Sequence, residues 1–346
     1  MTQTPTPSRA PWLTAVLDRL APLARTEPDG WVRATAWANV LVNSLLILTG
    51  GLVRLTGSGL GCPTWPRCTP DSWTSTPEMG INGAIEFGNR TLTGLVGLAA
   101  ILAFVAVVRM RRRHPDLFWL SLAVGIGVAV QAGVGGITVL TGLNPWVVGI
   151  HFVLSAIMIA LAMTAVCRAR RLSLPQVAAA ERAGQVVGRA GQHLRILAVL
   201  VGVLGFLVVY AGTLVTGTGP HAGDSGEVAR HAFDPYWVTR LHTAPAYLLL
   251  AAVVGGLVLG ARDRWPATLR RAYALLGLVL VIQGLIGYYQ FFNGVPVAAV
   301  AVHLVGSAVL VSVVATVVDR SFAVSAQDGA LAPGAPGADP AHLTRA

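Results

Sequence analysis

The sequence contains no lysine and little charge of any kind. Charged residues make up 12% of its 346 residues and hydrophobic residues 54%, whereas about 25% of the residues in soluble domains are charged. The mean hydropathy is +0.65. This composition excludes an ordinary soluble domain and indicates a membrane protein.

Because lysine is absent, all 25 side chains counted as Lys or Arg are arginines, and the net charge is +10. The arginines gather in short clusters between apolar runs, within residues 109–113, 168–195 and 261–271. This spacing is typical of cytoplasmic loops in membrane proteins. We therefore expect no nucleic-acid partner, although the chain is strongly basic.

Apolar runs that could each cross a bilayer, which takes about 20 residues, fill most of the chain. Four runs predict one transmembrane helix each: 34–53, 91–108, 196–223 and 241–261. Two longer runs, 117–167 and 272–318, predict two helices each, because turn residues interrupt them at TGLNPW and FFNGVP. The sequence therefore predicts an all-α membrane protein with eight transmembrane helices.

Arginine placement predicts how these helices are oriented. The arginine clusters occur in alternate loops, and the basic N-terminal region falls on the same side. By the positive-inside rule, both termini are cytoplasmic and the chain is a multi-pass protein of the cell membrane. No cleavable signal peptide is expected, because residues 1–30 lack a continuous apolar core.

The predicted helices divide the chain into two halves, with bundles at 34–166 and 193–318 and a cytoplasmic linker at 167–192. Residues 1–33 are expected to be a cytoplasmic segment, where apolar spacing between Trp12 and Leu23 predicts a short helix on the membrane surface. Residues 319–346, rich in Gly, Ala and Pro, predict a disordered cytoplasmic tail.

An internal repeat relates the two halves. Three residues recur with a constant offset of 152: Gln131, Gly135 and His151 become Gln283, Gly287 and His303. The sequence TGSG at 56–59 also resembles TGTG at 216–219. Because the first helix of each half starts on the cytoplasmic side, the repeats are parallel. We therefore expect two pseudo-symmetric four-helix bundles, related by an axis along the membrane normal.

Four polar residues are expected to lie at one depth in the membrane. His151, His242 and His303 each lie roughly five to seven residues into a helix that enters from the outer face, and Asn89 occupies the matching position. At ~1.5 Å per residue, this depth is about 10 Å. Three histidines on repeat-related helices favour heme ligation over isolated core histidines. Zinc fits less well, since it usually takes four tight ligands that include Cys or carboxylate.

The loop between the first two helices contains the motif GCPTWPRC. Its two cysteines, Cys62 and Cys68, lie on the predicted outer side, where oxidation is permitted. We expect them to form a disulfide, and free thiols or metal ligands are the alternatives. The third cysteine, Cys167, lies at a cytoplasmic helix end and is expected to be a reduced thiol.

The second helix begins with charged residues. Glu86, Asn89 and Arg90 share one helical face, because side chains three and four residues apart point the same way. That face should line the bundle interior, since exposure to lipid would cost several kcal/mol. Two interpretations of Glu86 stay open. It is either an ion-pair partner of Arg90 or a carboxylate at a heme edge that moves protons.

Together these features resemble the heme A synthase family, and most closely its actinobacterial type. The resemblance covers residues 34–318 and is carried by LTGSGLGCPTWPRC, AIEFGNR, GIHF, RLHT and VHLVGS. It implies an oxidoreductase that converts the C8 methyl group of heme O to a formyl group by successive hydroxylations. The product is heme A for cytochrome oxidase.

The resemblance also implies residue roles. His242 and His303 would bind heme b, His151 would face the substrate heme, and Glu86 would be essential to the chemistry. Many family members have a histidine where this chain has Asn89, so we expect an open coordination position on the substrate iron. Arginines near the outer face, Arg90 or Arg54, would bind the heme propionates.

The implied partners are membrane lipid, a heme O synthase and cytochrome oxidase assembly proteins, and a homo-oligomer is an open alternative. Two other functions are alternatives to this one. A quinol-linked diheme electron-transfer protein needs two complete bis-histidine sites, and Asn89 breaks one of them. A heme or small-molecule transporter would have binding groups near the bilayer midplane, whereas these histidines are predicted near the outer face.

Overall fold

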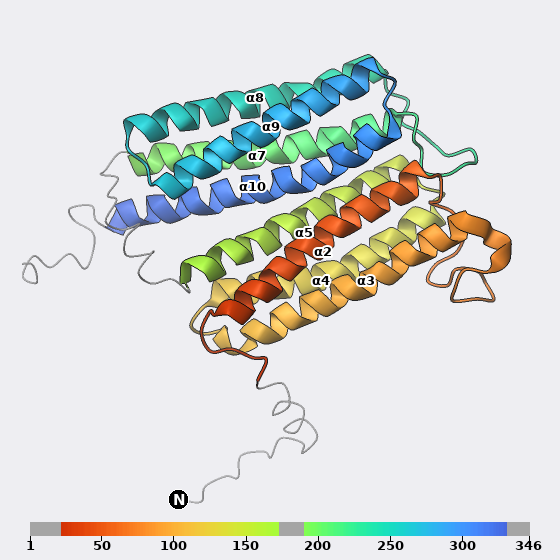
Figure 1. The fold of residues 1–346 in the computed structure, drawn as a ribbon, viewed down its shortest axis with the longest axis horizontal. Helices are drawn as coiled ribbons and strands as arrows, with labels where there is room; N and C mark the ends of the chain where they lie inside the picture. The colour runs from red at the N-terminus through yellow and green to blue at the C-terminus, as the bar shows by residue number, and fades with distance from the viewer. Residues whose placement is uncertain (1–21, 173–189, 331–346) are drawn as a thin grey trace, which may run out of the picture.

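The computed structural model describes residues 22–172 and 190–330 (Figure 1). Within these ranges it has eight helices long and apolar enough to cross a membrane. The same ranges contain no strand beyond one isolated bridge, between Ser58 and Asp224. The prediction of an all-α membrane protein with eight spans is confirmed. The predicted surface helix before residue 22, most of the linker and the end of the tail lie outside the described residues.

Each half contributes four of these helices. The first half contains α2 (Gly30–Leu55), α3 (Gly80–Val107), α4 (Pro115–Leu140) and α5 (Pro145–Leu172). The second half contains α7 (Ala190–Thr218), α8 (Pro235–Arg262), α9 (Ala267–Phe292) and α10 (Val297–Ala330). Two short 3-10 helices, Pro77–Met79 and Val108–Met110, flank α3.

Capping residues explain where two helices begin. The Asp29 carboxylate accepts hydrogen bonds from the backbone N–H groups of Trp31 and Val32, so α2 starts before the predicted residue 34. The Asp234 carboxylate caps α8 in the same way. An aspartate at this position satisfies backbone donors that have no partner inside the helix.

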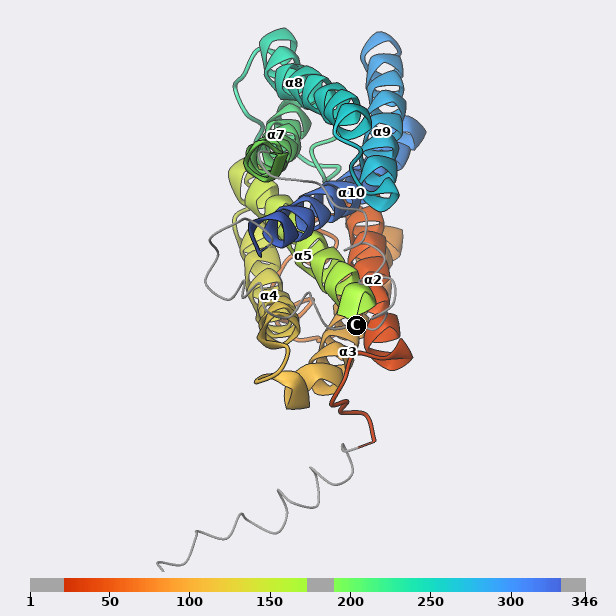
Figure 2. The same ribbon diagram turned by 90° about the vertical axis from the view of Figure 1, so that its left-hand side faces the viewer.

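The helix contacts run within each half and across one shared interface. In each half every helix contacts the next, and the last contacts the first. Across the interface, α10 contacts α2 and α5, and α5 contacts α7 (Figures 1 and 2). This pattern is compatible with two four-helix bundles packed side by side, and their pseudo-symmetry stays a prediction.

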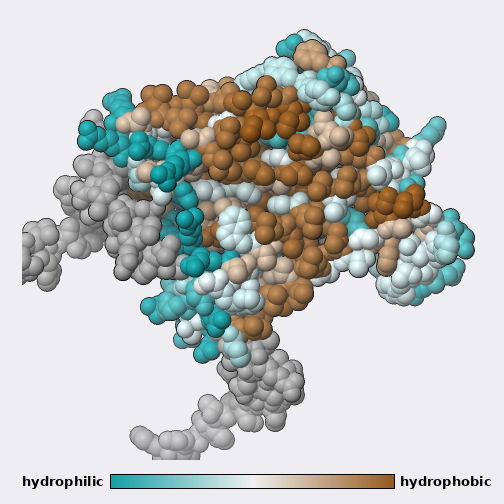
Figure 3. Space-filling model, in the orientation of Figure 1, coloured by the Kyte–Doolittle hydropathy of each residue, from teal (hydrophilic) through white to brown (hydrophobic). Residues whose placement is uncertain are grey.

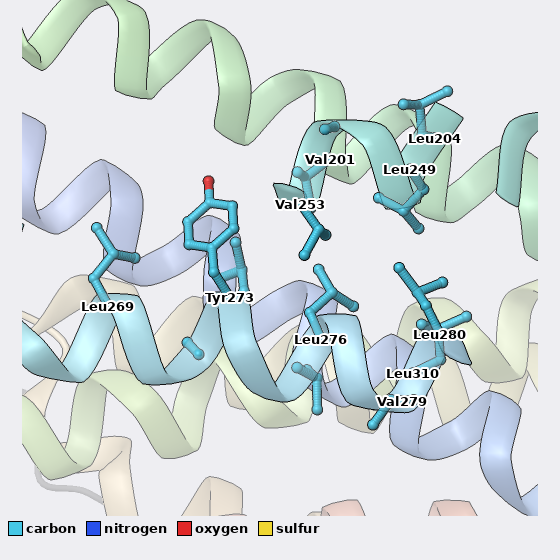
Figure 4. Packing of buried hydrophobic residues seen from close by; sticks show 14 of the residues in the cluster. Val201, Leu204, Leu249, Val253, Leu269, Tyr273, Leu276, Val279, Leu280 and Leu310 are labelled. Carbon is cyan, nitrogen blue, oxygen red and sulfur yellow. The ribbon is translucent and has the colours of Figure 1, made fainter. Parts of the chain in front are cut away.

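The surface and the core of the protein are both apolar. Hydrophobic residues cover the middle of the face seen in Figure 3, and hydrophilic residues gather toward its ends. Inside the second half, side chains of α9 point toward α7 and α8 (Figure 4), and Leu249, Tyr273 and Leu276 are fully buried. An apolar surface around an apolar core is what a bilayer environment selects.

Two helices continue past their predicted ends at residues 166 and 318. The buried carboxylate of Asp319 on α10 forms ion pairs with Arg168 at 3.1 Å and Arg171 at 3.2 Å, both on α5. Arg168 also pairs with Asp116 of α4, and Arg320 donates to the Thr268 carbonyl. These contacts hold the chain in helical conformation beyond the apolar run. Residues 319–330, predicted as disordered, are therefore helical.

Asp319 should stabilise the contact between the two halves. We expect Asp319→Ala to lower the free energy of unfolding by about 2 kcal/mol, because it removes a buried carboxylate that pairs with two partly buried arginines, of which, among the described residues, only Arg168 keeps a second acidic partner, Asp116. Thermal unfolding of the purified protein, followed by circular dichroism, measures the change. Asp263→Ala removes only the exposed pair with Arg262 and should change stability by less than about 0.5 kcal/mol. Equal stability of the two variants would contradict this role for Asp319.

Candidate functional site

Glu86 is buried and fully engaged in hydrogen bonds. Its Oε2 accepts the backbone N–H of Cys62 at 2.6 Å, and its Oε1 accepts from Nε and Nη2 of Arg90 at 3.1 and 2.5 Å. The interpretation of Glu86 as an ion-pair partner of Arg90 therefore matches the geometry. The same carboxylate also ties α3 to residues 56–76, which we call the outer loop.

Arg90 extends this anchor along the outer loop. Its Nη1 donates to the carbonyls of Thr64 and Arg67, and its Nη2 donates to the carbonyl of Cys62 as well as to Glu86. With Nε bonded to Glu86, all five N–H groups of the guanidinium have partners. A heme propionate could bind Arg90 only by displacing one of these bonds. This weighs against the predicted role of Arg90 in heme binding.

The outer loop is also held by a disulfide and by the second half. Cys62 and Cys68 are joined, as predicted, and both are buried. The backbone N–H of Gly59 donates to the Gly223 carbonyl at 2.7 Å, next to the bridge between Ser58 and Asp224. Cys167 is a free thiol at the far end of α5, as expected. The first part of the outer loop, residues 58–68, is therefore held both by the disulfide and by the second half.

The four polar residues predicted at one depth, which we call the histidine layer, each lie against a glycine of a neighbouring helix. The pairs are Gly50 with Asn89, Gly135 with His151, Gly212 with His242, and Gly287 with His303. A Cβ added at Gly212 would lie 3.1 Å from the His242 ring, and one added at Gly135 would lie 3.2 Å from the His151 ring. The glycines leave room for the rings. Sequence reasoning missed Gly50 and Gly212, because they are 162 residues apart and the 152-residue offset does not relate them.

The structure brings His242 and His303 together. Their ring centres are 6.4 Å apart and their planes are 80° apart. Two imidazoles that bind one iron from opposite sides have ring centres about 6.2 Å apart, given a metal–nitrogen bond of about 2.0 Å and about 1.1 Å from nitrogen to ring centre. Nδ1 of His242 donates to the Val208 carbonyl at 2.9 Å, which leaves Nε2 free to bind a metal. The pair therefore fits bis-imidazole ligation of a heme iron.

The first half offers one histidine to a ligand. Nδ1 of His151 and Oδ1 of Asn89 are buried, and neither has a hydrogen-bond partner among the described residues. Gln131 donates to the backbone carbonyl of His151 at 3.0 Å and so holds that turn of α5. Buried polar atoms without partners often mark a place where a ligand binds. In the described ranges, no group of three or more His, Cys, Asp or Glu is arranged for a metal ion.

A second arginine lies where the two halves meet at the outer end. Nη2 of Arg54 donates to the Thr216 carbonyl at 2.7 Å, while its Nε is buried without a partner among the described residues. Burial, and then the charge of Arg54, lower the pKa of nearby His231 and favour its neutral form. Of the two predicted propionate ligands, Arg54 keeps an N–H group available and Arg90 does not.

Comparisons with known proteins agree with these features. The family model COX15-CtaA, described as cytochrome oxidase assembly protein, matches residues 33–315. A heme A synthase of Symbiobacterium thermophilum is 29% identical over 196 residues, which cover 56% of this chain and 62% of that protein. A heme A synthase of Shouchella clausii is 25% identical over 258 residues, 73% of this chain and 82% of that protein.

A third relative has a different name. A protoheme IX farnesyltransferase of Thermus thermophilus is 36% identical over 109 residues, which cover 31% of this chain and 17% of that protein. The chain also spans less than two thirds of the Symbiobacterium protein, at 62% of its length.

Proposed function

This chain belongs to the COX15-CtaA family of cytochrome oxidase assembly proteins, and from that membership we propose that it is a heme A synthase. The proposed reaction oxidises the C8 methyl group of heme O to a formyl group. Two successive hydroxylations give a gem-diol, which loses water. Overall, one methyl group and one water molecule give one formyl group, and four electrons and four protons are released.

The observation that carries the proposal is the histidine pair of the second half. His242 and His303 hold heme b, which supplies one-electron transfer when bound. Their ring separation of 6.4 Å matches two axial imidazoles on one iron. The bond from His242 to Val208 fixes the orientation of that ring. With both imidazoles bound to its iron, heme b would pass electrons, and this half would perform no chemistry on the heme.

The first half binds the substrate heme. His151 is its single histidine ligand, and the neutral amide of Asn89 lies at the other position of the histidine layer. An iron with one strong ligand keeps a coordination position open, which suits oxidation chemistry. Arg54 binds a propionate through its available Nε–H, while Arg90 keeps its place in the outer loop.

Glu86 is the residue that moves protons in this proposal. Its oxygens accept hydrogen bonds from Cys62 and Arg90. Oε1 accepts two of these bonds, whereas Oε2 accepts one and keeps a lone pair that can take a proton. In this proposal the carboxylate therefore acts as a general base through Oε2, within the frame of the outer loop.

The cellular setting follows from the same membership. The chain is a multi-pass membrane protein, which we place in the cell membrane with both termini in the cytoplasm. The similarity to part of a protoheme IX farnesyltransferase supports a partner that farnesylates heme and delivers the product. Other cytochrome oxidase assembly proteins receive the heme A product. A homo-oligomer of this chain is compatible with these roles.

The glycine beside His242 gives a test of the heme b site. We expect Gly212→Ala to lower the amount of bound low-spin heme, because the added Cβ would lie 3.1 Å from the imidazole and force the ring to shift by a few tenths of an ångström. Gly255→Ala on α8 meets open space and is the matched control. The absorption spectrum of the reduced, purified protein measures the heme. Normal low-spin heme in both Gly212→Ala and His242→Ala would refute the site.

The proposed activity is tested in cells that make heme O. Heme A should appear in extracted pigments only when this chain is expressed, and Glu86→Gln should lower it about 100-fold or more, because the general base is lost. Glu78→Gln, at an exposed residue outside the site, serves as the control. Absence of heme A with the unmodified chain would reject the function. A normal amount of heme A in Glu86→Gln would show that Glu86 serves only as the structural ion-pair partner of Arg90.

A further inference from the structure

The disulfide loop places one aromatic side chain against α4. Trp65 lies between Cys62 and Cys68, and its indole packs directly on Gly136. A Cβ at position 136 would clash with three carbons of the indole ring. The ring can therefore take this position only because residue 136 is a glycine. Trp65 is still 40% exposed, so part of its surface is free to contact something else.

This position is next to the proposed substrate site. Gly136 follows Gly135, the residue that lies against the His151 ring. Two adjacent residues of α4 thus each have a ring packed on them, one from the proposed iron ligand and one from the outer loop. Successive residues of a helix point about 100° apart, so the two rings lie on adjoining faces of α4 at nearly the same level along the helix.

The loop holds Trp65 without help from a ligand. Arg90 donates to the carbonyls of Thr64 and Arg67, on either side of the Trp65–Pro66 pair. Glu86 accepts the N–H of Cys62, and the disulfide closes the loop. A side chain fixed in this way loses little conformational entropy when it contacts a ligand.

The second half has no counterpart of this arrangement. The 152-residue offset places Tyr288 at the position of Gly136, and the Tyr288 hydroxyl is bonded to Tyr247. Residues 219–234, which connect α7 to α8, contain neither Cys nor Trp. The difference matches the proposed roles, because heme b stays bound while the substrate heme enters and its product leaves in every reaction cycle.

We propose that Trp65 is a positioning residue that covers the outer edge of the porphyrin bound at His151. The identity of that porphyrin rests on the proposed function. The indole affects how long a porphyrin stays bound and takes no part in the reaction. It slows the release of the porphyrin from the first half. Flat aromatic rings suit this role, because they bury a large apolar area and lose little freedom.

The test compares two ways of removing the cover with two matched controls. Trp65→Ala deletes the indole, and Gly136→Ala displaces it. Trp73→Ala removes a more exposed indole before α3, and Gly133→Ala adds a Cβ to α4 in open space. Each purified protein is loaded with heme O or with iron protoporphyrin, which lacks the farnesyl chain. Release from the first half to excess apomyoglobin is followed by absorption, and low-spin heme b reports an intact fold.

Trp65→Ala and Gly136→Ala should release both porphyrins about tenfold faster and raise KM for heme O with little change in kcat. Trp65→Phe should restore most of the retention, and the two controls should match the unmodified protein. Release from Trp65→Ala as slow as from Trp73→Ala would overturn the proposal, and so would faster release confined to heme O. Loss of low-spin heme b in Trp65→Ala, Trp65→Phe and Gly136→Ala together would also overturn it, since the loop would then be structural.

The two proposals can fail separately. A protein that retains porphyrin through Trp65 but forms no heme A from heme O would reject the synthase function and leave the role of Trp65 standing.

Discussion

Polar groups inside a bilayer need partners from the protein, because no water is there to supply them. Two groups of buried polar residues show how this chain meets that constraint. Glu86 and Asp319 form ion pairs with arginines and hold the outer loop and the two halves in place. Nδ1 of His151 and Oδ1 of Asn89 are among the buried atoms that have no hydrogen-bond partner among the described residues. The ion pairs build the frame, and His151 and Asn89 lie where we propose that the substrate heme binds.

The two halves use a similar layer of residues for different purposes. In the second half two imidazoles face each other at the separation that one iron requires. In the first half Asn89 replaces one imidazole, and the outer loop adds a disulfide, a buried carboxylate and an indole. We propose that the loss of one ligand opens a position on the substrate iron and that the added loop covers the site. In this account, electron transfer and heme oxidation are divided between two related bundles.

Much of the fold could be predicted from the sequence, because each membrane-spanning helix is set by its own apolar run and by the arginines beside it, and not by contacts with distant residues. The repeat also predicted the histidine layer, of which the structure shows the contact between His242 and His303, and the common depth of all four residues stays a prediction. The end of α10 was not, because Asp319 pairs with arginines of α5 that are distant in the sequence. The partners of Arg90 were missed for a related reason. They are mainly backbone carbonyls of the outer loop, which no residue type indicates.

The central claim is that the first half gives the substrate iron one imidazole and an open position. Electron paramagnetic resonance of the oxidised heme tests it in a protein whose His242 and His303 are both replaced by alanine. The account predicts a high-spin signal that becomes low-spin when Asn89→His is added. A low-spin bis-histidine signal with Asn89 still present would contradict it, because another residue would then supply the second ligand.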